Sequence, residues 1–164
     1  MYDVVTLGEA MLRLSPPNYM RLEQTDSFDV NVGGSELNTS VGVARFGMRT
    51  AWVTKLVKSP LGRMVANKAR EHGIDTSHIV WVDEGRVGIY YLELGSTPRA
   101  SRVIYDRKDS AVSKLGPGEV LAHHFEGDKA FSYQWNYRCS EPNLSRSYNR
   151  GYKRGKEARL QSLF

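Results

Sequence analysis

An α/β fold is predicted for residues 1–130 on three observations. Short β-branched apolar runs alternate with amphipathic segments of helical period, which is the pattern of a parallel sheet joined by crossover helices. Each amphipathic segment begins at a helix-start signal, Gly33-Gly34-Ser35 or Ser59-Pro60. A second group of strands alternates apolar and polar residues, which is typical of a sheet with one face open to solvent or to a ligand. We therefore expect a main sheet with helices and a smaller sheet beside it.

The first strand and the first helix are adjacent units of the main sheet. Residues 3–8 form a β-branched run that ends in Gly8, as a buried parallel strand does. Ser35 is the predicted N-cap of the helix, and Gly47 is placed to end it. The predicted apolar stripe of this helix comprises Leu37, Val41 and Ala44.

The same strand and helix order then repeats. Residues 50–56 predict the next strand, and a second helix begins at Ser59-Pro60 and ends before Gly73. Residues 79–82 predict a further strand. The predicted apolar face of the second helix comprises Leu61, Met64, Val65 and Ala69. Strand, helix, strand and helix in succession favour parallel strands with crossovers.

The smaller sheet is predicted from segments that lie apart in the sequence. Residues 11–15 and 28–32 alternate in polarity and are separated by a turn-rich stretch. Residues 87–94 and 101–107 flank a short loop and predict a hairpin. Together these segments form a small sheet beside the main one.

Three hairpin residues, Tyr90, Tyr105 and Arg107, are candidate ligand contacts. A period of two places Tyr105 and Arg107 on one face of the second arm. Aromatic residues are common in strands and an Arg often extends to water, so a purely structural role is one interpretation. The other is a sugar-acid site, where Tyr hydroxyls bond to sugar hydroxyls and the guanidinium binds a carboxylate.

The Gly33-Gly34 pair also has two interpretations. The glycines can simply let the chain turn from a strand into a helix. They can also let a ligand approach the backbone amides at the helix N-terminus. No GxGxxG fingerprint is present. His123-His124 has no second ligand cluster nearby in the sequence, so we interpret it as surface histidines and predict no metal site.

Composition excludes several classes of protein. The chain has 164 residues, of which 40% are hydrophobic and 25% charged, a globular rather than disordered composition. No stretch approaches the ~20 apolar residues of a membrane span, and residues 1–20 lack the regions of a signal peptide. Cys139 is the single cysteine, so no internal disulfide is expected. We expect a cytoplasmic protein without membrane contact.

Residues 131–164 differ in composition from the rest of the chain. They hold seven Lys and Arg against two acidic residues, which accounts for the whole formal net charge of +5, while residues 1–130 are balanced. The tyrosines and the tryptophan among these cations are Tyr133, Trp135, Tyr137, Tyr148 and Tyr152. An alternative function is therefore a non-enzymatic binding domain whose basic aromatic tail contacts nucleic acid.

Five segments, taken in order, make residues 1–130 resemble a known family. They are GEAMLRLSP, FDVNVGGSELNTSVGVARFG, TKLVKSPLGRMVANKAREHGID, VGIYYLELG and RVIYDRKDSA. This order is similar to the N-terminal half of the ribokinase-like (PfkB) carbohydrate kinases, and most like the 2-keto-3-deoxygluconate kinases. The resemblance implies a three-layer α/β/α ribokinase-like fold with a small β-sheet lid, truncated after roughly the first half. Residues 11–15, 28–32 and 87–107 would hold the lid strands.

The resemblance also implies a reaction, a site and partners. Such kinases transfer the γ-phosphoryl group of ATP, with Mg²⁺, to a sugar hydroxyl. The implied substrate is a sugar acid such as 2-keto-3-deoxygluconate, with Arg107 holding its carboxylate. The implied substrate-binding residues are Gly33, Gly34, Asn38, Tyr90, Tyr105 and Arg107. Lid sheets in related kinases often pair between subunits, which implies a homodimer through the lid.

The catalytic part of the family pattern is missing from the sequence. Family members carry a GAGD-like motif in their C-terminal half, whose Asp is the general base, and no GxGD occurs in the 164 residues. The resemblance therefore assigns no catalytic residue to this chain and little of an ATP site, and we expect an inactive fragment. A binding or regulatory relative of the kinases is also compatible with the sequence.

Residues from about 131 onward are expected to be a shifted reading frame. Back-translating residues 131–137 and reading from the second base of each codon allows His, Ile, Ser, Gly and Ile in succession, similar to a His-x-Ser-Gly-Ile segment of the kinases. The same shift over residues 151–159 allows a strong helix with a glycine stop. On this hypothesis the rest of the sheet is absent, the tail is poorly packed, and strands 3–8 and 50–56 are under-covered.

Overall fold

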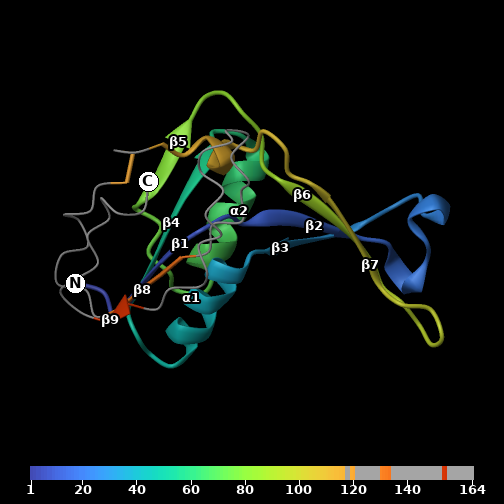
Figure 1. Ribbon diagram of the computed structural model, residues 1–164, viewed down its shortest axis with the longest axis horizontal. Coiled ribbons are helices and arrows are strands. Elements are labelled where there is room, and N and C mark those ends of the chain that lie inside the picture. Colours follow the sequence, from blue (N-terminus) through green and yellow to red (C-terminus); the bar gives the residue numbers. More distant parts are fainter. Residues whose placement is uncertain (117–118, 121–129, 134–152, 155–164) are drawn as a thin grey trace.

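The computed structural model describes residues 1–116, 119–120, 130–133 and 153–154, which form two sheets (Figure 1). The strands are β1 (Val4–Leu7), β2 (Met11–Ser15), β3 (Asp29–Gly33), β4 (Thr50–Val57), β5 (Ile79–Val82), β6 (Ile89–Glu93), β7 (Arg102–Asp106), β8 (Ala130–Tyr133) and β9 (Lys153–Arg154). The main sheet has the order β5-β4-β1-β8-β9 and is parallel except for the β8/β9 pair. The small sheet has the order β3-β2-β6-β7 and projects from one end of the main sheet.

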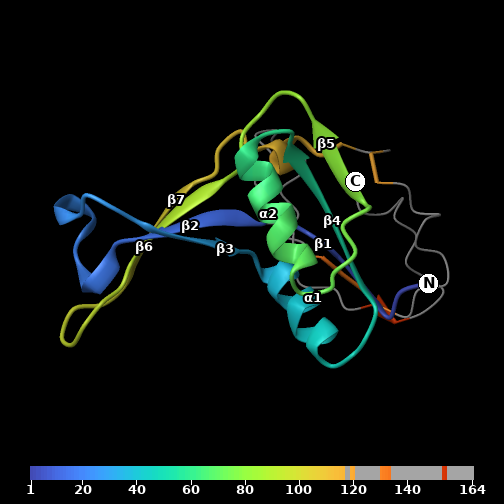
Figure 2. The same ribbon diagram turned by 180° about the vertical axis from the view of Figure 1, so that it is seen from behind.

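The two α-helices of the described residues pack on the same face of the main sheet (Figure 2). They are α1 (Ser35–Arg45) and α2 (Pro60–Arg70). Trp52 and Leu56 of β4 face them and share one apolar cluster with Leu37 of α1 and Val65 of α2. This alternation of parallel strands and crossover helices confirms the predicted α/β class.

The opposite face of the main sheet is also covered. Val5 of β1 and Val53 of β4 are almost fully buried in a second apolar cluster with Leu115 and Val120. On the same face, the Lys55 ammonium donates hydrogen bonds to the Glu119 carboxylate at 2.7 and 2.9 Å and ties this segment to β4. The expectation that strands 3–8 and 50–56 are under-covered was therefore wrong, because the chain that follows β7 returns across them.

The first helix begins one residue earlier than predicted. Gly34 is its N-cap, and Ser35 is already helical. The Ser35 hydroxyl donates a hydrogen bond to Glu36 Oε2 at 3.0 Å. The predicted Ser35 cap was wrong because the turn is made by the glycine. Gly47 has φ of +78° just after the helix, which confirms the predicted stop.

The second helix keeps its predicted start and shifts its predicted face. The Ser59 hydroxyl accepts a hydrogen bond from the Gly62 amide at 3.1 Å, with Pro60 in the first turn. Leu61 and Met64 are each 45% exposed, so their predicted place on the buried face was wrong. Gly62 faces the sheet in their place: a Cβ there would collide with the Val57 carbonyl oxygen of β4. This glycine lets α2 approach the strand closely.

The small sheet has two faces of opposite character, set by its register. β6 and β7 pair antiparallel, which confirms the predicted hairpin, and β2 joins β6 in parallel. The polar face carries one cross-strand row of Asn31, Arg13, Tyr90 and Tyr105. The apolar face carries the next row, Val30, Leu14, Tyr91 and Ile104. Paired residues share a face, so the two rows point to opposite sides of the sheet.

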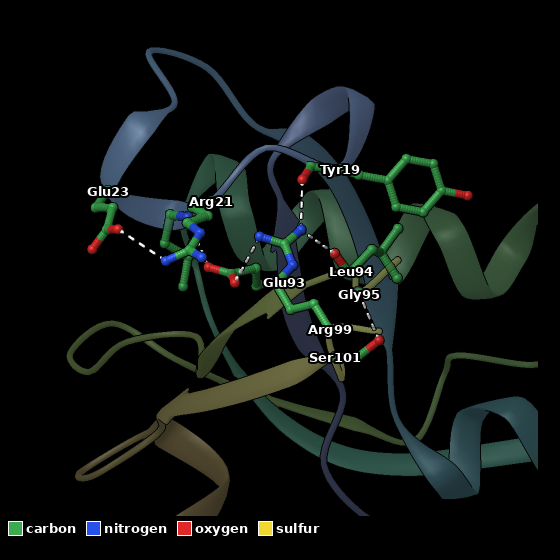
Figure 3. A network of polar contacts seen from close by, with 9 residues as sticks. Tyr19, Arg21, Glu23, Glu93, Leu94, Gly95, Arg99 and Ser101 are labelled. Atoms are coloured by element: carbon green, nitrogen blue, oxygen red, sulfur yellow. Dashed lines mark hydrogen bonds and ion pairs between the residues drawn. The ribbon is translucent and has the colours of Figure 1, made fainter. Parts of the chain in front are cut away.

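The far end of the small sheet is held by a network around Arg99 (Figure 3). The Arg99 guanidinium donates to the carbonyl oxygens of Tyr19 and Leu94 at 2.7 and 3.0 Å and lies 3.5 Å from Glu93 Oε1. Glu93 Oε2 in turn accepts from the Leu22 amide at 3.0 Å. These contacts join the β6–β7 loop to the two 3-10 turns between β2 and β3, η1 (Pro17–Tyr19) and η2 (Leu22–Gln24).

Two strands lie where the sequence predicted no further part of the sheet. β8 pairs in parallel with β1, opposite the side taken by β4, and β9 pairs with β8. The expectation that the sheet stops short was therefore wrong for these residues. The predictions for His123-His124 and for most of the tail lie outside the described residues. Within the described part of the chain, no helix is long and apolar enough to cross a membrane.

Candidate functional site

The two glycines bring the start of α1 against the small sheet. A Cβ on Gly33 would collide with the Tyr90 hydroxyl, so the Tyr90 side chain lies directly over the Gly33 backbone. A Cβ on Gly34 would collide with the carbonyl oxygen of Glu9 in the turn between β1 and β2. Both positions therefore need glycine for close approach, and the candidate site lies where β1, α1 and the small sheet meet.

The tyrosines of the hairpin form the outer wall of this site. Tyr90 and Tyr105 are directly opposite in register, with ring centroids 5.8 Å apart and an interplanar angle of 37°. Tyr105 is 61% exposed, which is unusual for so large an aromatic side chain in a sheet. The structure thus brings Gly33, Tyr90 and Tyr105 together on the polar face.

Arg107 lies just beyond the end of β7 and already has a carboxylate partner. Its Nη2 atom is 2.6 Å from Oε2 of Glu9. The two groups form an ion pair whose angles are not those of a hydrogen bond. Oε1 of Glu9 accepts a hydrogen bond from the Ser110 hydroxyl at 2.7 Å. The Glu9 side chain is only 6% exposed and that of Arg107 is 23% exposed. The guanidinium predicted to hold a ligand carboxylate is therefore positioned by a buried carboxylate of the chain itself.

A second acidic residue, Glu36, lies at the start of α1. Burial raises the pKa of the Glu36 carboxyl, while its own backbone amide, the Ser35 hydroxyl and the Arg107 charge pull that pKa down. Gly8 makes room for it, because a Cβ at Gly8 would overlap the Glu36 side chain. The site therefore contains two buried acids near one ion-paired guanidinium.

One predicted site residue is placed differently. The backbone N–H of Asn38 donates a hydrogen bond to the Gly34 carbonyl oxygen at 2.8 Å, which is the first helical bond of α1. Its side chain is exposed and makes no hydrogen bond to any described residue. Asn38 thus shapes the turn through its backbone, while the structure does not bring its side chain to the two tyrosines.

Several residues of the site were not singled out from the sequence. Glu9 had a usable signal, because it follows β1 at the carboxyl edge of a parallel sheet, where ligands bind in open α/β folds. Gly88 also had one, as an isolated glycine at a strand start; a Cβ there would lie 2.7 Å from Glu9 Oε1. Ser110 had none, since it lies 101 residues from its partner Glu9.

The described residues do not fit the binding of ATP or Mg²⁺. Among them, no group of three or more His, Cys, Asp or Glu side chains is arranged to hold a metal ion. The Arg107 guanidinium is engaged with Glu9 and interacts with the Glu36 carboxyl. Binding and orienting a polar, hydroxyl-rich ligand is the chemistry these residues can perform.

Known proteins share this part of the chain. The family model "pfkB family carbohydrate kinase" matches residues 1–123. The chain is 43% identical over 129 residues to a 2-dehydro-3-deoxygalactonokinase of Haloferax volcanii, covering 79% of this chain and 40% of that protein. It is 35% identical over 130 residues to a 5-dehydro-2-deoxygluconokinase of Shouchella clausii, covering 78% and 40%.

A solved structure shows the same fold. The 2-dehydro-3-deoxygluconokinase of Thermotoga maritima superimposes with a TM-score of 0.77 at 42% identity, covering 81% of this chain and 41% of that one. The chain thus spans about two fifths of the length of these relatives. The matched residues contain both glycines, the hairpin tyrosines and Arg107. The chain therefore belongs to the PfkB family of carbohydrate kinases.

Proposed function

We propose that residues 1–130 form the sugar-binding part of a carbohydrate kinase whose substrate is a 2-keto-3-deoxy sugar acid. The observation that carries the proposal is the cluster of Gly33, Tyr90, Tyr105 and Arg107 at the junction of the two sheets. Two relatives that share this part of the chain are named for 2-dehydro-3-deoxy sugar acids. Tyr hydroxyls suit sugar hydroxyls, and a guanidinium suits a carboxylate.

The residues of the site would bind and orient the substrate. The exposed ring of Tyr105 and the half-buried ring of Tyr90 form a wall against which a sugar can stack. The glycine backbone at the start of α1 leaves room for the ligand. Arg107, fixed by Glu9, would bind the carboxylate without losing much side-chain entropy.

The test is a calorimetric titration of the 164-residue chain with 2-keto-3-deoxygluconate and with a neutral hexose. The parent chain should prefer the acid. Arg107→Met should weaken acid binding by about 1.5–3 kcal/mol and leave the hexose almost unchanged. Because this change leaves Glu9 unpaired, Glu9→Gln/Arg107→Met serves as the control for a buried charge. Equal losses for both ligands would contradict the assignment.

ATP and Mg²⁺ are the family's co-substrate and metal, and the proposal assigns neither to a described residue. When bound, they would supply the phosphoryl group and the cation that neutralises its charge. The 164 residues contain no GxGD sequence for the general base. We therefore expect no ATP-dependent phosphorylation of the sugar acid by this chain alone, and formation of phosphorylated sugar acid in a coupled assay would contradict this.

The apolar face of the small sheet supports a homodimer through the lid as part of the proposal. Val30 is 50% exposed and Ile104 is 38% exposed on this face, where Tyr91 also contacts Phe28 edge to face at 5.9 Å. A second copy would cover these side chains. Light scattering should give a dimer for the parent chain and a monomer for Val30→Asp. A monomeric parent at high micromolar concentration would count against the dimer.

The composition of residues 131–164 and their back-translation support a shifted reading frame from about residue 131. The nucleotide sequence of this region tests the proposal directly. A kinase-like continuation should follow in another frame, starting with the His-x-Ser-Gly-Ile segment. An intact frame without such a continuation would refute it.

A further inference from the structure

One guanidinium on the polar face has no partner within the described chain. Arg13 lies in the middle of β2, between Asn31 of β3 and Tyr90 of β6 in register. The Nε atom of its side chain is buried, and the guanidinium makes no hydrogen bond or ion pair with any residue that the structure describes. Burying part of a charged group without a partner is unfavourable. An acceptor supplied by a ligand would complete this arrangement.

Arg107 differs from Arg13 in its electrostatic environment. The charge of Arg107 is matched by Glu9 at 2.6 Å, and Ser110 holds that carboxylate in place. Glu36 adds a second acidic group, since its carboxyl interacts with the Arg107 charge. Taken alone, this group of three therefore has no net positive charge, and Arg107 would contribute hydrogen bonds to a carboxylate rather than long-range attraction. Arg13 supplies the positive charge that the site otherwise lacks.

The two arginines are close enough to act on one small ligand. Tyr105 is in the same cross-strand row as Arg13, and Arg107 follows Tyr105 by two residues on the same side of the hairpin. Rows two residues apart in a strand are separated by about 7 Å. A six-carbon acid stacked on the tyrosine wall would span the distance between the two rows and be within reach of both long side chains.

We propose that Arg13 is a specificity-determining residue whose guanidinium binds the carboxylate of the sugar acid together with Arg107. This inference rests on the proposed function and names the residue that sets the preference for an acid over a neutral sugar. Arg107, already paired with Glu9, orients the ligand, while Arg13 contributes the uncompensated charge.

The experiment compares Arg13→Gln, Arg13→Lys and a matched control, Arg102→Gln. The Arg102→Gln substitution removes the same charge from the same small sheet. Arg102 itself is exposed and lies on the face that carries Ile104. Each full 164-residue variant is titrated calorimetrically with 2-keto-3-deoxygluconate and with its neutral methyl ester. Thermal unfolding of each variant is recorded in parallel.

Arg13→Gln should bind the acid at least about tenfold more weakly than the parent, as loss of a charge-assisted hydrogen bond predicts, and bind the ester within about twofold. Arg13→Lys, which keeps the charge, should retain most of the preference for the acid, and Arg102→Gln should match the parent. This pattern would support the role of Arg13.

Two results would overturn the inference and leave the proposed function intact. They are acid binding by Arg13→Gln equal to that of the parent, and equal losses of acid and ester binding, which indicate a structural role. If the parent chain itself shows no preference for the acid, the proposed function fails, and the role of Arg13 fails with it.

Discussion

Strand β4 of the main sheet and strand β7 of the small sheet use their side chains in opposite ways. All eight residues of β4 are buried, whereas four of the five residues of β7 are exposed. β4 has a neighbouring strand on each side and packed clusters above and below, while β7 is an edge strand paired only with β6. The main sheet is packed on both faces, whereas the small sheet adds only a few side chains, such as Leu12 of β2, to the core and leaves its outer strand exposed.

This difference separates stability from recognition within one short chain. Because the side chains of β6 and β7 contribute little to the core, Tyr105 can remain exposed and available to a ligand. Residues at the junction of the sheets, such as Glu9 and Glu36, serve both regions: they are buried like core residues and charged like site residues. Substitutions in the two regions should therefore have different consequences.

The largest expected effect is the loss of stability on emptying the core. Trp52 is fully buried, so Trp52→Ala should lower the free energy of unfolding by about 3–5 kcal/mol. Val103 of β7 is 44% exposed, so Val103→Ala should change it by less than about 0.5 kcal/mol. Urea unfolding followed by circular dichroism measures both values. Similar losses at the two positions would break the comparison.

A smaller effect on the free energy of unfolding is expected when two helix glycines with different surroundings are each replaced by alanine. Gly62→Ala forces α2 away from the Val57 carbonyl oxygen and should cost about 1–3 kcal/mol. Gly42 of α1 has nothing within 4 Å of an added Cβ, so Gly42→Ala should stabilise the chain by about 0.5–1 kcal/mol. Opposite signs in urea unfolding are the predicted outcome, and equal signs would refute the packing of α2 on β4.

The smallest expected effect is a pH dependence at the junction. Burial raises the pKa of Glu36 above 4.5, so the folded chain binds a proton more tightly than the unfolded chain. This group therefore destabilises the fold as the pH rises from 4.5 through its raised pKa. Glu36→Gln should be more stable than the parent at neutral pH, and the difference should vanish below pH 4.5. A difference that does not depend on pH would contradict this cause.

Much of the fold could be predicted because its signals are local. The cap at Ser59, the stop at Gly47 and the alternation in the hairpin each specify an element within a few residues. The predictions were wrong where the burial of a residue depends on segments that lie far from it in the sequence. Whether Leu61 is buried depends on how closely Gly62 lets α2 approach β4, and the covering of β1 depends on Leu115 and Val120.

The candidate site was predictable in part for the same reason. Tyr105 and Arg107 share a face through strand periodicity, which the sequence displays, whereas the register that places Tyr90 opposite Tyr105 is visible only in the structure. The partner of Arg107 could not be predicted, because Glu9 reaches it only when β1 and the end of β7 come together. The lack of a partner at Arg13 is likewise visible only once the sheet register is known.

The most direct test of the central claim is to map ligand binding on the ¹⁵N-labelled 164-residue chain by NMR during titration with 2-keto-3-deoxygluconate. The account predicts that the amide signals of Gly33, Gly34, Tyr90 and Tyr105 shift in a saturable way, while those of β4 and β5 do not. The contradicting result is a spectrum unchanged by the sugar acid, or shifts confined to residues 134–152.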